Sequence, residues 1–123
     1  MKKIDIKNSS FVINENASIQ QAMESITDNQ RGTAIVVDDE FYLVGIVADG
    51  DIRRAMVSGA TVLAPISKIV NTNPTVITKD EFNPEKITEV FDSESDIGII
   101  PVVDEKNKLV SLAVRNPEKR KEL

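Results

Sequence analysis

Thr-Ala-Ile-Val-Val-Asp, at residues 33–38, and Leu-Val-Gly-Ile, at 43–46, return as Ile-Ile-Pro-Val-Val-Asp at 99–104 and Leu-Val-Ser-Leu at 109–112. The two copies are separated by 66 residues without a gap, and Gly, Val, Val, Asp, Leu and Val are identical at 32/98, 36/102, 37/103, 38/104, 43/109 and 44/110. Two copies in a chain of 123 residues predict two similar units. Units this short bury their apolar faces against each other, so the crevice between them is the first place to look for a functional site.

The first copy predicts the order strand, helix, strand, strand, helix, with the opening strand at 11–13. Ser18 and Gln21 form a capping-box pair that marks the start of the first helix. The β-branched runs at 33–37 and 43–48 predict two strands, and a second helix begins at Asp49 or Gly50 and ends near Gly59. Helical spacing predicts buried stripes made of Ile19, Ala22, Met23 and Ile26 in the first helix and Ile52, Ala55 and Met56 in the second.

The second copy repeats this order up to its last helix. Residues 75–78 predict a strand, Asn83 and Pro84 fit the start of a helix, and Ile87, Val90 and Phe91 form its apolar stripe. The chain therefore divides into a first repeat at 1–64, a linker at 65–75, a second repeat at 76–114 and a charged tail or linker at 115–123. Within that linker, residues 65–70 predict a short helical turn. The last helix of the second repeat is expected to be short or missing.

Composition narrows the possible chemistry. The chain has no Cys and no His, which removes thiolate nucleophiles, imidazole bases and most zinc, haem and iron–sulfur sites. We therefore expect no catalytic residue and no enzyme activity. We also expect no metal site, because Asp38-Asp39-Glu40 has the counterpart Asp104-Glu105-Lys106, which places a cation in the turn.

Charge and hydropathy narrow the possible partners. A net charge of −5 and a pI near 4.8 argue against nucleic acid and anionic membranes as partners. The longest apolar run, residues 97–103, falls far short of the ~20 residues that span a bilayer. The N-terminal sequence lacks the apolar core of a signal peptide, so a cytoplasmic location is predicted.

Residues 43–55, Leu-Val-Gly-Ile-Val-Ala-Asp-Gly-Asp-Ile-Arg-Arg-Ala, resemble the signature of the CBS domain, the cystathionine-β-synthase-type regulatory module. That signature runs Gly, two apolar residues, Thr or Ser, two variable residues, Asp and an apolar residue, which places Gly45, Ala48 and Asp51 here. The resemblance covers nearly the whole chain. It implies an α/β fold of two strand-helix-strand-strand-helix repeats packed as a pseudo-two-fold pair. Residues 49–54 resemble CBS pairs associated with sugar-phosphate nucleotidyltransferases, and also those of sugar-phosphate isomerases.

The resemblance also implies a function. In such pairs an adenine nucleotide lies in the cleft between the repeats, with Thr or Ser on the phosphate and Asp on the ribose hydroxyls. It implies a homodimeric, ligand-sensing regulatory module that binds AMP, ADP, ATP or a related phosphorylated metabolite and controls an attached or partner nucleotidyltransferase. The candidate ligand-binding residues are Ile13, Thr33, Ala48, Asp49, Gly50, Asp51, Arg53 and Arg54.

Physical chemistry leaves two interpretations of these residues open. A helix that begins at Asp49 to Asp51, with Gly50 allowing close approach, is suited to phosphate, and the Asp51 carboxylate is suited to vicinal hydroxyls. Alternatively, Asp49 and Asp51 only cap the helix, and the two arginines are solvated or contact a partner. Because Ala48 lacks a hydroxyl and the second repeat has Val114 and Pro117 at the matching positions, the alternative function is a ligand-free structural dimerisation module.

Overall fold

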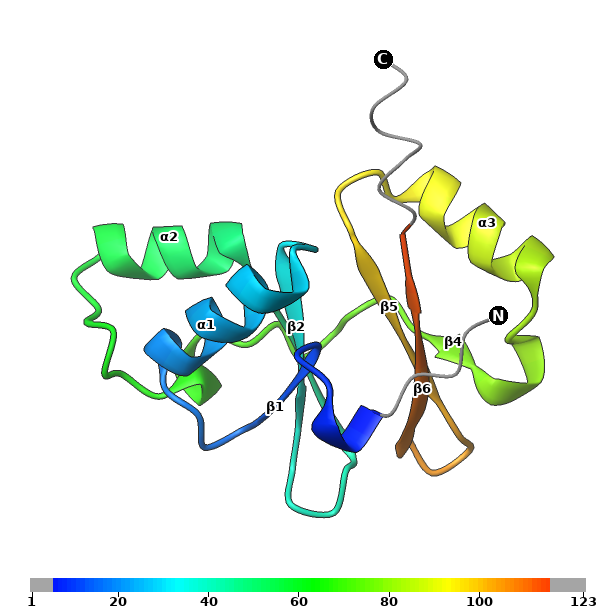
Figure 1. Cartoon of the computed structure of the whole chain (residues 1–123), viewed down its shortest axis with the longest axis horizontal. Coiled ribbons are helices and arrows are strands. Elements are labelled where there is room, and N and C mark those ends of the chain that lie inside the picture. The colour runs from blue at the N-terminus through cyan, green and yellow to red at the C-terminus, as the bar shows by residue number, and fades with distance from the viewer. Residues whose placement is uncertain (1–5, 116–123) are drawn as a thin grey trace.

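Two three-stranded sheets lie back to back in the computed structural model, which describes residues 6–115 (Figure 1). In each sheet the first strand runs parallel to the second, and the third runs antiparallel to it. The sheet of the first repeat contains β1 (Val12–Asn14), β2 (Thr33–Val37) and β3 (Leu43–Ala48), and that of the second contains β4 (Ile77–Thr78), β5 (Ile99–Val103) and β6 (Leu109–Val114).

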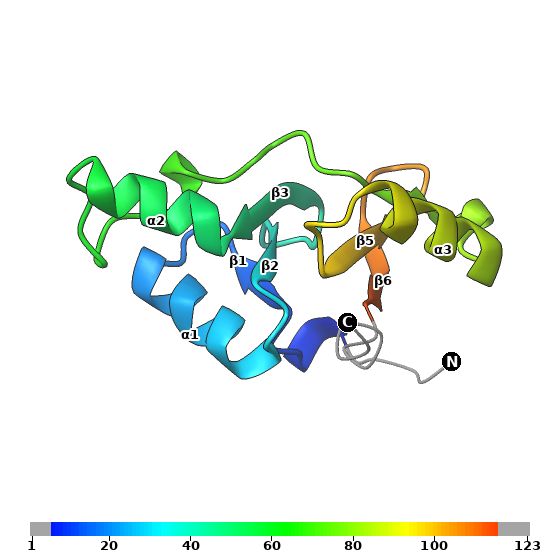
Figure 2. The ribbon, with the colours of Figure 1, turned by 90° about the horizontal axis from the view of Figure 1, so that it is seen from above.

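Helices cover the outer faces of the two sheets (Figure 2). The first repeat carries α1 (Ile19–Asn29) and α2 (Asp49–Val57), and the second carries α3 (Pro84–Ser93). Three short 3-10 helices lie at Ile6–Asn8, Ile66–Lys68 and Lys79–Glu81. The mixed α/β fold of two repeats is therefore confirmed, as are the strands at 33–37 and 43–48 and the helical turn before residue 70.

The hairpins of the two repeats match in detail. Both ladders change register at the same place, between Val36 and Val37 and between Val102 and Val103. The carboxylate of Asp38 accepts the N–H groups of residues 40 and 42 at 2.9 and 3.0 Å, and that of Asp104 accepts those of residues 106 and 108 at the same distances. These backbone bonds hold the pKa of Asp104 below its ordinary value. The aspartates thus fasten the turns.

The repeats are related by a pseudo-two-fold axis that passes between these hairpins. Leu43 N–H donates to the carbonyl of Asn107, and Leu109 N–H donates to the carbonyl of Phe41, both at 2.9 Å. Adding 66 to the number of the first donor, Leu43, gives the second donor, and subtracting 66 from the first acceptor, Asn107, gives the second acceptor. A shared apolar cluster fills the space between the sheets and consists of Ile35, Val37, Ile46, Ile99, Leu109 and Leu112.

The predicted start of α1 is confirmed, whereas part of its predicted stripe is wrong. The Ser18 hydroxyl oxygen accepts the Gln21 N–H at 3.2 Å, and the Gln21 side chain accepts the Ser18 N–H at 2.9 Å. Met23 is 38% exposed, because the buried face is rotated toward two polar residues, Ser25 and Asn29. Ser25 donates to the carbonyl of Ser10, and Asn29 donates to the carbonyls of Ser10 and Thr33 at 3.1 and 2.9 Å.

The prediction that Met56 is buried in α2 is wrong in the same way. Met56 follows buried Ile52 by four residues, as Met23 follows buried Ile19, and it is 39% exposed. A helix on one face of a sheet buries a stripe only about 100° wide, so the i+4 position lies at its edge.

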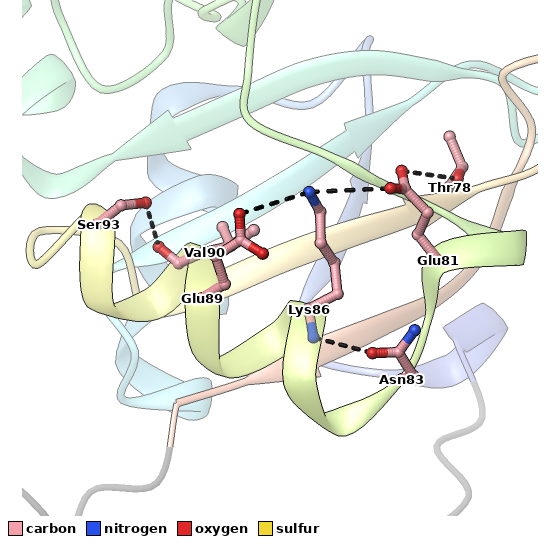
Figure 3. Close-up of polar contacts among 7 residues, drawn as sticks. All are labelled: Thr78, Glu81, Asn83, Lys86, Glu89, Val90 and Ser93. Atoms are coloured by element: carbon pink, nitrogen blue, oxygen red, sulfur yellow. Dashed lines mark hydrogen bonds and ion pairs between the residues drawn. The ribbon is translucent and has the colours of Figure 1, made fainter.

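The start of α3 follows the prediction (Figure 3). The Asn83 side chain accepts the Lys86 N–H at 2.9 Å, and the Lys86 ammonium lies 3.8 Å from Glu81 and 3.9 Å from Glu89. Val90 and Phe91 are buried, as the spacing predicts. The strand predicted at 75–78 is shorter than expected, Ile77–Thr78, and before it the Thr75 hydroxyl donates to the carboxylate of Glu94, the residue after α3.

Two further expectations differ from the described chain or fall outside it. The opening strand is Val12–Asn14, one residue later than predicted. Through Arg115 the described residues contain no helix after β6. Pro117 and most of the predicted charged tail at 115–123 lie outside the described residues. The prediction of a short or missing last helix is therefore answered only as far as Arg115.

The linker packs tightly against β3 at Gly45. Ile46 and Asn71 exchange two backbone hydrogen bonds of 3.0 and 2.8 Å beside it. A Cβ on Gly45 would overlap the Asn71 carbonyl oxygen and lie 2.9 Å from Val70 Cγ2. Its counterpart in the second repeat is Ser111, which carries a side chain.

We therefore expect Gly45→Ala to lower the free energy of unfolding by about 1–3 kcal/mol, the usual cost of overpacking. Urea denaturation followed by circular dichroism measures the change. Ser111→Ala, the matched control, should stay within about 0.5 kcal/mol of the parent. Equal stability of the Gly45→Ala protein and the parent would show that the linker does not pack on β3 as described.

Candidate ligand-binding site

The junction of β3 and α2 is held by a carboxylate that reaches back along the helix. Ala48 is the residue before the helix and has no side-chain group to cap it. Instead, Asp51 Oδ2 accepts the Ala48 N–H at 2.9 Å, and Asp51 Oδ1 accepts a hydrogen bond from the Arg54 guanidinium at 2.7 Å. Both oxygens of Asp51 are therefore engaged within the chain.

The same ion pair places a cation over the start of α2. Side-chain exposure is 75% for Arg54 and 25% for Asp51, so the guanidinium faces solvent while its partner is largely covered. A Cβ on Gly50 would lie 3.2 Å from an Arg54 guanidinium nitrogen, which shows how closely the side chain covers the first turn. The positive end of the helix dipole and a fixed guanidinium thus coincide, an arrangement that attracts anions.

A cavity of about 810 Å³ opens beside this first turn. Its walls come from the C-terminal end of α1, the start of α2 and, in the second repeat, the loop before β5. The loops before β2 and β5 lie at the upper end of the sheets in Figure 1. The lining residues are Ile26, Thr27, Gln30, Arg31, Gly32, Ala48, Asp49, Gly50, Arg54 and Asp96.

Two backbone contacts fix the shape of the cavity. Asp49 N–H donates to the Gly32 carbonyl at 3.0 Å, which joins the start of α2 to the loop after α1. A Cβ on Gly98 would lie 2.5 Å from the Arg31 carbonyl oxygen, so the two repeats meet backbone to backbone there. The cavity therefore lies between repeats whose relative position is set by main-chain packing.

The structure brings together four of the predicted ligand-binding residues, namely Ala48, Asp49, Gly50 and Arg54. Arg53 does not line this cavity but a neighbouring hollow of about 480 Å³ between α1 and α2, which shares Thr27 and Asp49 with it. Asp51 fastens the helix and lines neither hollow. Thr33 is only 4% exposed, and Ile13 lines a third hollow, of about 360 Å³, on the first repeat.

Sequence reasoning missed Arg31 and Asp96, two charged residues of the cavity wall. Arg31 Nε is buried without a hydrogen-bond partner, while one terminal nitrogen donates to the Gln30 carbonyl at 3.2 Å. Asp96 stands 66 residues after Gln30, in the matching loop of the second repeat. The signal that could have found both was the repeat itself, because matching loops of a two-fold pair lie on the same side of the cleft.

Within 6–115, no three His, Cys, Asp or Glu side chains are grouped so that they could hold a metal ion. None of the helices in that range is long and apolar enough to cross a membrane.

Comparison with known proteins identifies the kind of fold. Residues 3–58 match the family model of the CBS domain. An uncharacterized protein of Chlamydia pneumoniae is 36% identical over 83 residues, which cover 65% of this chain and 25% of that protein. Arabinose 5-phosphate isomerase GutQ of Escherichia coli O6:H1 is 29% identical over 93 residues, covering 76% and 28%. The chain thus spans about a quarter of the length of these curated relatives.

Solved structures extend the likeness to both repeats. A crystal structure of CBSX2 in complex with AMP is 24% identical, with a TM-score of 0.69 over 94% of this chain and 88% of that one. A CBS domain protein from Pyrobaculum aerophilum complexed with AMP is 21% identical, with a TM-score of 0.67 over 84% and 78%. The first repeat therefore matches the CBS domain in sequence, and the chain has the fold of a CBS domain pair.

The geometry of Asp51 predicts a structural role for this carboxylate. We expect Asp51→Ala to lower the free energy of unfolding by about 0.5–2 kcal/mol, the usual cost of losing a helix cap. Arg54→Ala, which removes only the exposed ion pair, should cost at most about 1 kcal/mol. Urea denaturation of both variants tests this, and an unchanged midpoint for Asp51→Ala would contradict the capping role.

Proposed function

We propose that the chain is a regulatory module that senses a phosphorylated metabolite, in the first place an adenine nucleotide, in the cavity between its repeats. The observation that carries the proposal is the Arg54 guanidinium, which Asp51 fixes over the start of α2 on the cavity wall. The AMP complexes of two proteins with the same fold support the choice of ligand.

Three features of the cavity suit a phosphate. The first N–H groups of a helix lack intrahelical acceptors, and at α2 they meet the positive end of the helix dipole. Arg54 adds guanidinium donors, although its charge is shared with Asp51, and Arg31 adds a second guanidinium from the loop after α1. The volume of about 810 Å³ lies in the range of pockets that enclose small ligands.

The regulated protein is proposed from the sequence of residues 49–54 and from one relative. That segment resembles CBS pairs associated with sugar-phosphate nucleotidyltransferases, and an attached or partner nucleotidyltransferase is the target we propose. The match to an isomerase of a sugar phosphate favours the wider class of sugar-phosphate enzymes. In this proposal the chain itself supplies regulation, and the attached or partner enzyme supplies catalysis.

A second candidate function is a structural dimerisation module, and the outer face of the first repeat favours it. Met23, Met56 and Val57 are 38%, 39% and 85% exposed on α1 and α2. They border two hollows of about 480 and 450 Å³ that share Met23 and Thr27. An apolar face of this kind is suited to an isologous contact with a second copy, so we propose a homodimer through α1 and α2.

Titration calorimetry with AMP, ADP and ATP tests the ligand. We expect weak binding to the parent and about fivefold tighter binding to Ala48→Thr, because a new hydroxyl supplies one neutral hydrogen bond to the phosphate. Val114→Thr, the counterpart in the second repeat, should leave the affinity unchanged. If none of the nucleotides binds to the parent or to Ala48→Thr, the dimerisation module becomes the better interpretation.

Sedimentation equilibrium tests the homodimer. We expect the parent to be a dimer at tens of micromolar and Met56→Glu to shift it toward monomer, because the dimer would bury the added charge. Val110→Glu is the control, since Val110 is 40% exposed but lies on β6 of the other repeat. A monomeric parent, or equal effects of both substitutions, would exclude a dimer through α1 and α2.

A further inference from the structure

The cavity has two carboxylates whose side chains remain available to a ligand. Asp51, the residue that the family resemblance assigns to ribose hydroxyls, has both oxygens engaged by Ala48 N–H and by Arg54. Asp49 and Asp96 line the cavity and are exposed. Among the described residues, neither side chain accepts a hydrogen bond or joins an ion pair. Of the two, Asp96 comes from the second repeat and faces the first across the cavity.

Arg115 fixes the loop that carries Asp96. Its guanidinium donates to the carbonyl oxygens of Phe91, Glu94 and Ile97, each at 2.9 Å, and lies 4.7 Å from the centre of the Phe91 ring. Its backbone N–H donates to the Gly98 carbonyl at 2.9 Å. The chain is therefore anchored on both sides of Asp96, and the carboxylate projects from a loop that needs little further ordering to bind.

The two repeats contribute different charges to the cavity. The first repeat supplies Arg31, Arg54 and the start of α2 together with the Asp49 carboxylate, whereas the charged lining residue of the second repeat is Asp96. A phosphate is attracted to the arginines and the helix start and repelled by the carboxylates. An ionised carboxylate only accepts hydrogen bonds, so its natural partners in a ligand are hydroxyl groups, and vicinal hydroxyls can occupy both of its oxygens.

We infer that Asp96 is a specificity-determining residue that accepts hydrogen bonds from the vicinal hydroxyls of a pentose phosphate, either free or as part of a ribonucleotide, whose phosphate lies at the start of α2. This assignment rests on the proposed function and adds a ligand contact from the second repeat. One ligand then joins the two repeats, with its phosphate on the first and its hydroxyls on the second. Arg115 is the positioning residue that holds Asp96 in place.

The experiment compares Asp96→Asn with the parent by calorimetry, using AMP, 2′-deoxy-AMP and ribose 5-phosphate as probes. We expect Asp96→Asn to weaken AMP about tenfold, because a charge-assisted hydrogen bond is lost, and 2′-deoxy-AMP at most about twofold. Asp92→Asn is the matched control, since Asp92 is an exposed carboxylate on α3 of the same repeat. It should change neither affinity. Thermal melting of each variant checks that it is folded.

The outcomes separate this inference from the proposed function. Suppose that the parent binds AMP. If Asp96→Asn then weakens the binding of AMP and 2′-deoxy-AMP equally, or changes the binding of neither, Asp96 does not select hydroxyls, while the proposed function stands. If ribose 5-phosphate binds with the same response to Asp96→Asn and AMP does not bind, the ligand is a free pentose phosphate. If none of the three probes binds to the parent, the proposed function fails and the role of Asp96 fails with it.

The positioning role of Arg115 has its own test. Arg115→Lys keeps the positive charge. The single ammonium of lysine lacks the planar, forked geometry with which the guanidinium holds three carbonyls at once. We expect Arg115→Lys to reduce the preference for AMP over 2′-deoxy-AMP, and to have no further effect on this preference when Asp96 is already Asn. An effect of equal size in both backgrounds would show that Arg115 acts independently of Asp96.

Discussion

The backbone pairing of the two hairpins is the constraint on which the rest of the structure depends. Leu43 donates to Asn107 and Leu109 donates to Phe41, and each bond is the pseudo-two-fold counterpart of the other. Loss of this pairing would break both bonds and displace the two sheet faces that pack together in the central cluster. The cavity depends on the same pairing, because Arg31 and Asp96 belong to different repeats and line one space only in this register.

The repeat predicted most of the fold because its strongest signals are local or periodic. Strands β2 and β5 are buried along their whole length, so an unbroken apolar run identifies them without any tertiary information. The starts of α1 and α3 follow from caps at Ser18 and Asn83 that act within one turn. Met23 could not be placed in this way. Its exposure depends on buried Ser25 and Asn29, which both donate to the carbonyl of Ser10, 15 and 19 residues away, and hydrophobic periodicity carries no information about such bonds.

The candidate site shows the same division between near and distant residues. Four residues of the cavity lining belong to a single sequence motif, which predicts all of them: Ala48, Asp49, Gly50 and Arg54. Arg31 and Asp96 lie in the loops before the second strands of the two repeats, and they share a cavity with α2 because the two-fold pairing of the repeats brings these matching loops together. The motif at α2 does not contain this pairing, and the repeat in the sequence is the signal that points to it. A motif fixes residue types but not their partners. For this reason Asp51 was predicted as a ligand residue, although its carboxylate is engaged by its own helix.

The two repeats differ at the cleft in how they place a cation at the C-terminal end of their first helix. The carbonyls at the C-terminal end of the first helix in each repeat carry partial negative charge and are stabilised by a nearby cation. In the first repeat Arg31, just after α1, donates to the Gln30 carbonyl from within its own loop and leaves the space beside α2 open. In the second repeat the cation is Arg115, which stands 66 residues after Asp49 and must cross from the end of β6 to reach Phe91 and Glu94. Its guanidinium lies against the end of α3 and also donates to the Ile97 carbonyl in the loop before β5. Asp49, at the equivalent position of the first repeat, carries a carboxylate that has no hydrogen to donate to helix-end carbonyls, and it lines the cavity instead. This one pair of equivalent positions thus places a carboxylate on the cavity wall in the first repeat and a guanidinium against the end of α3 in the second.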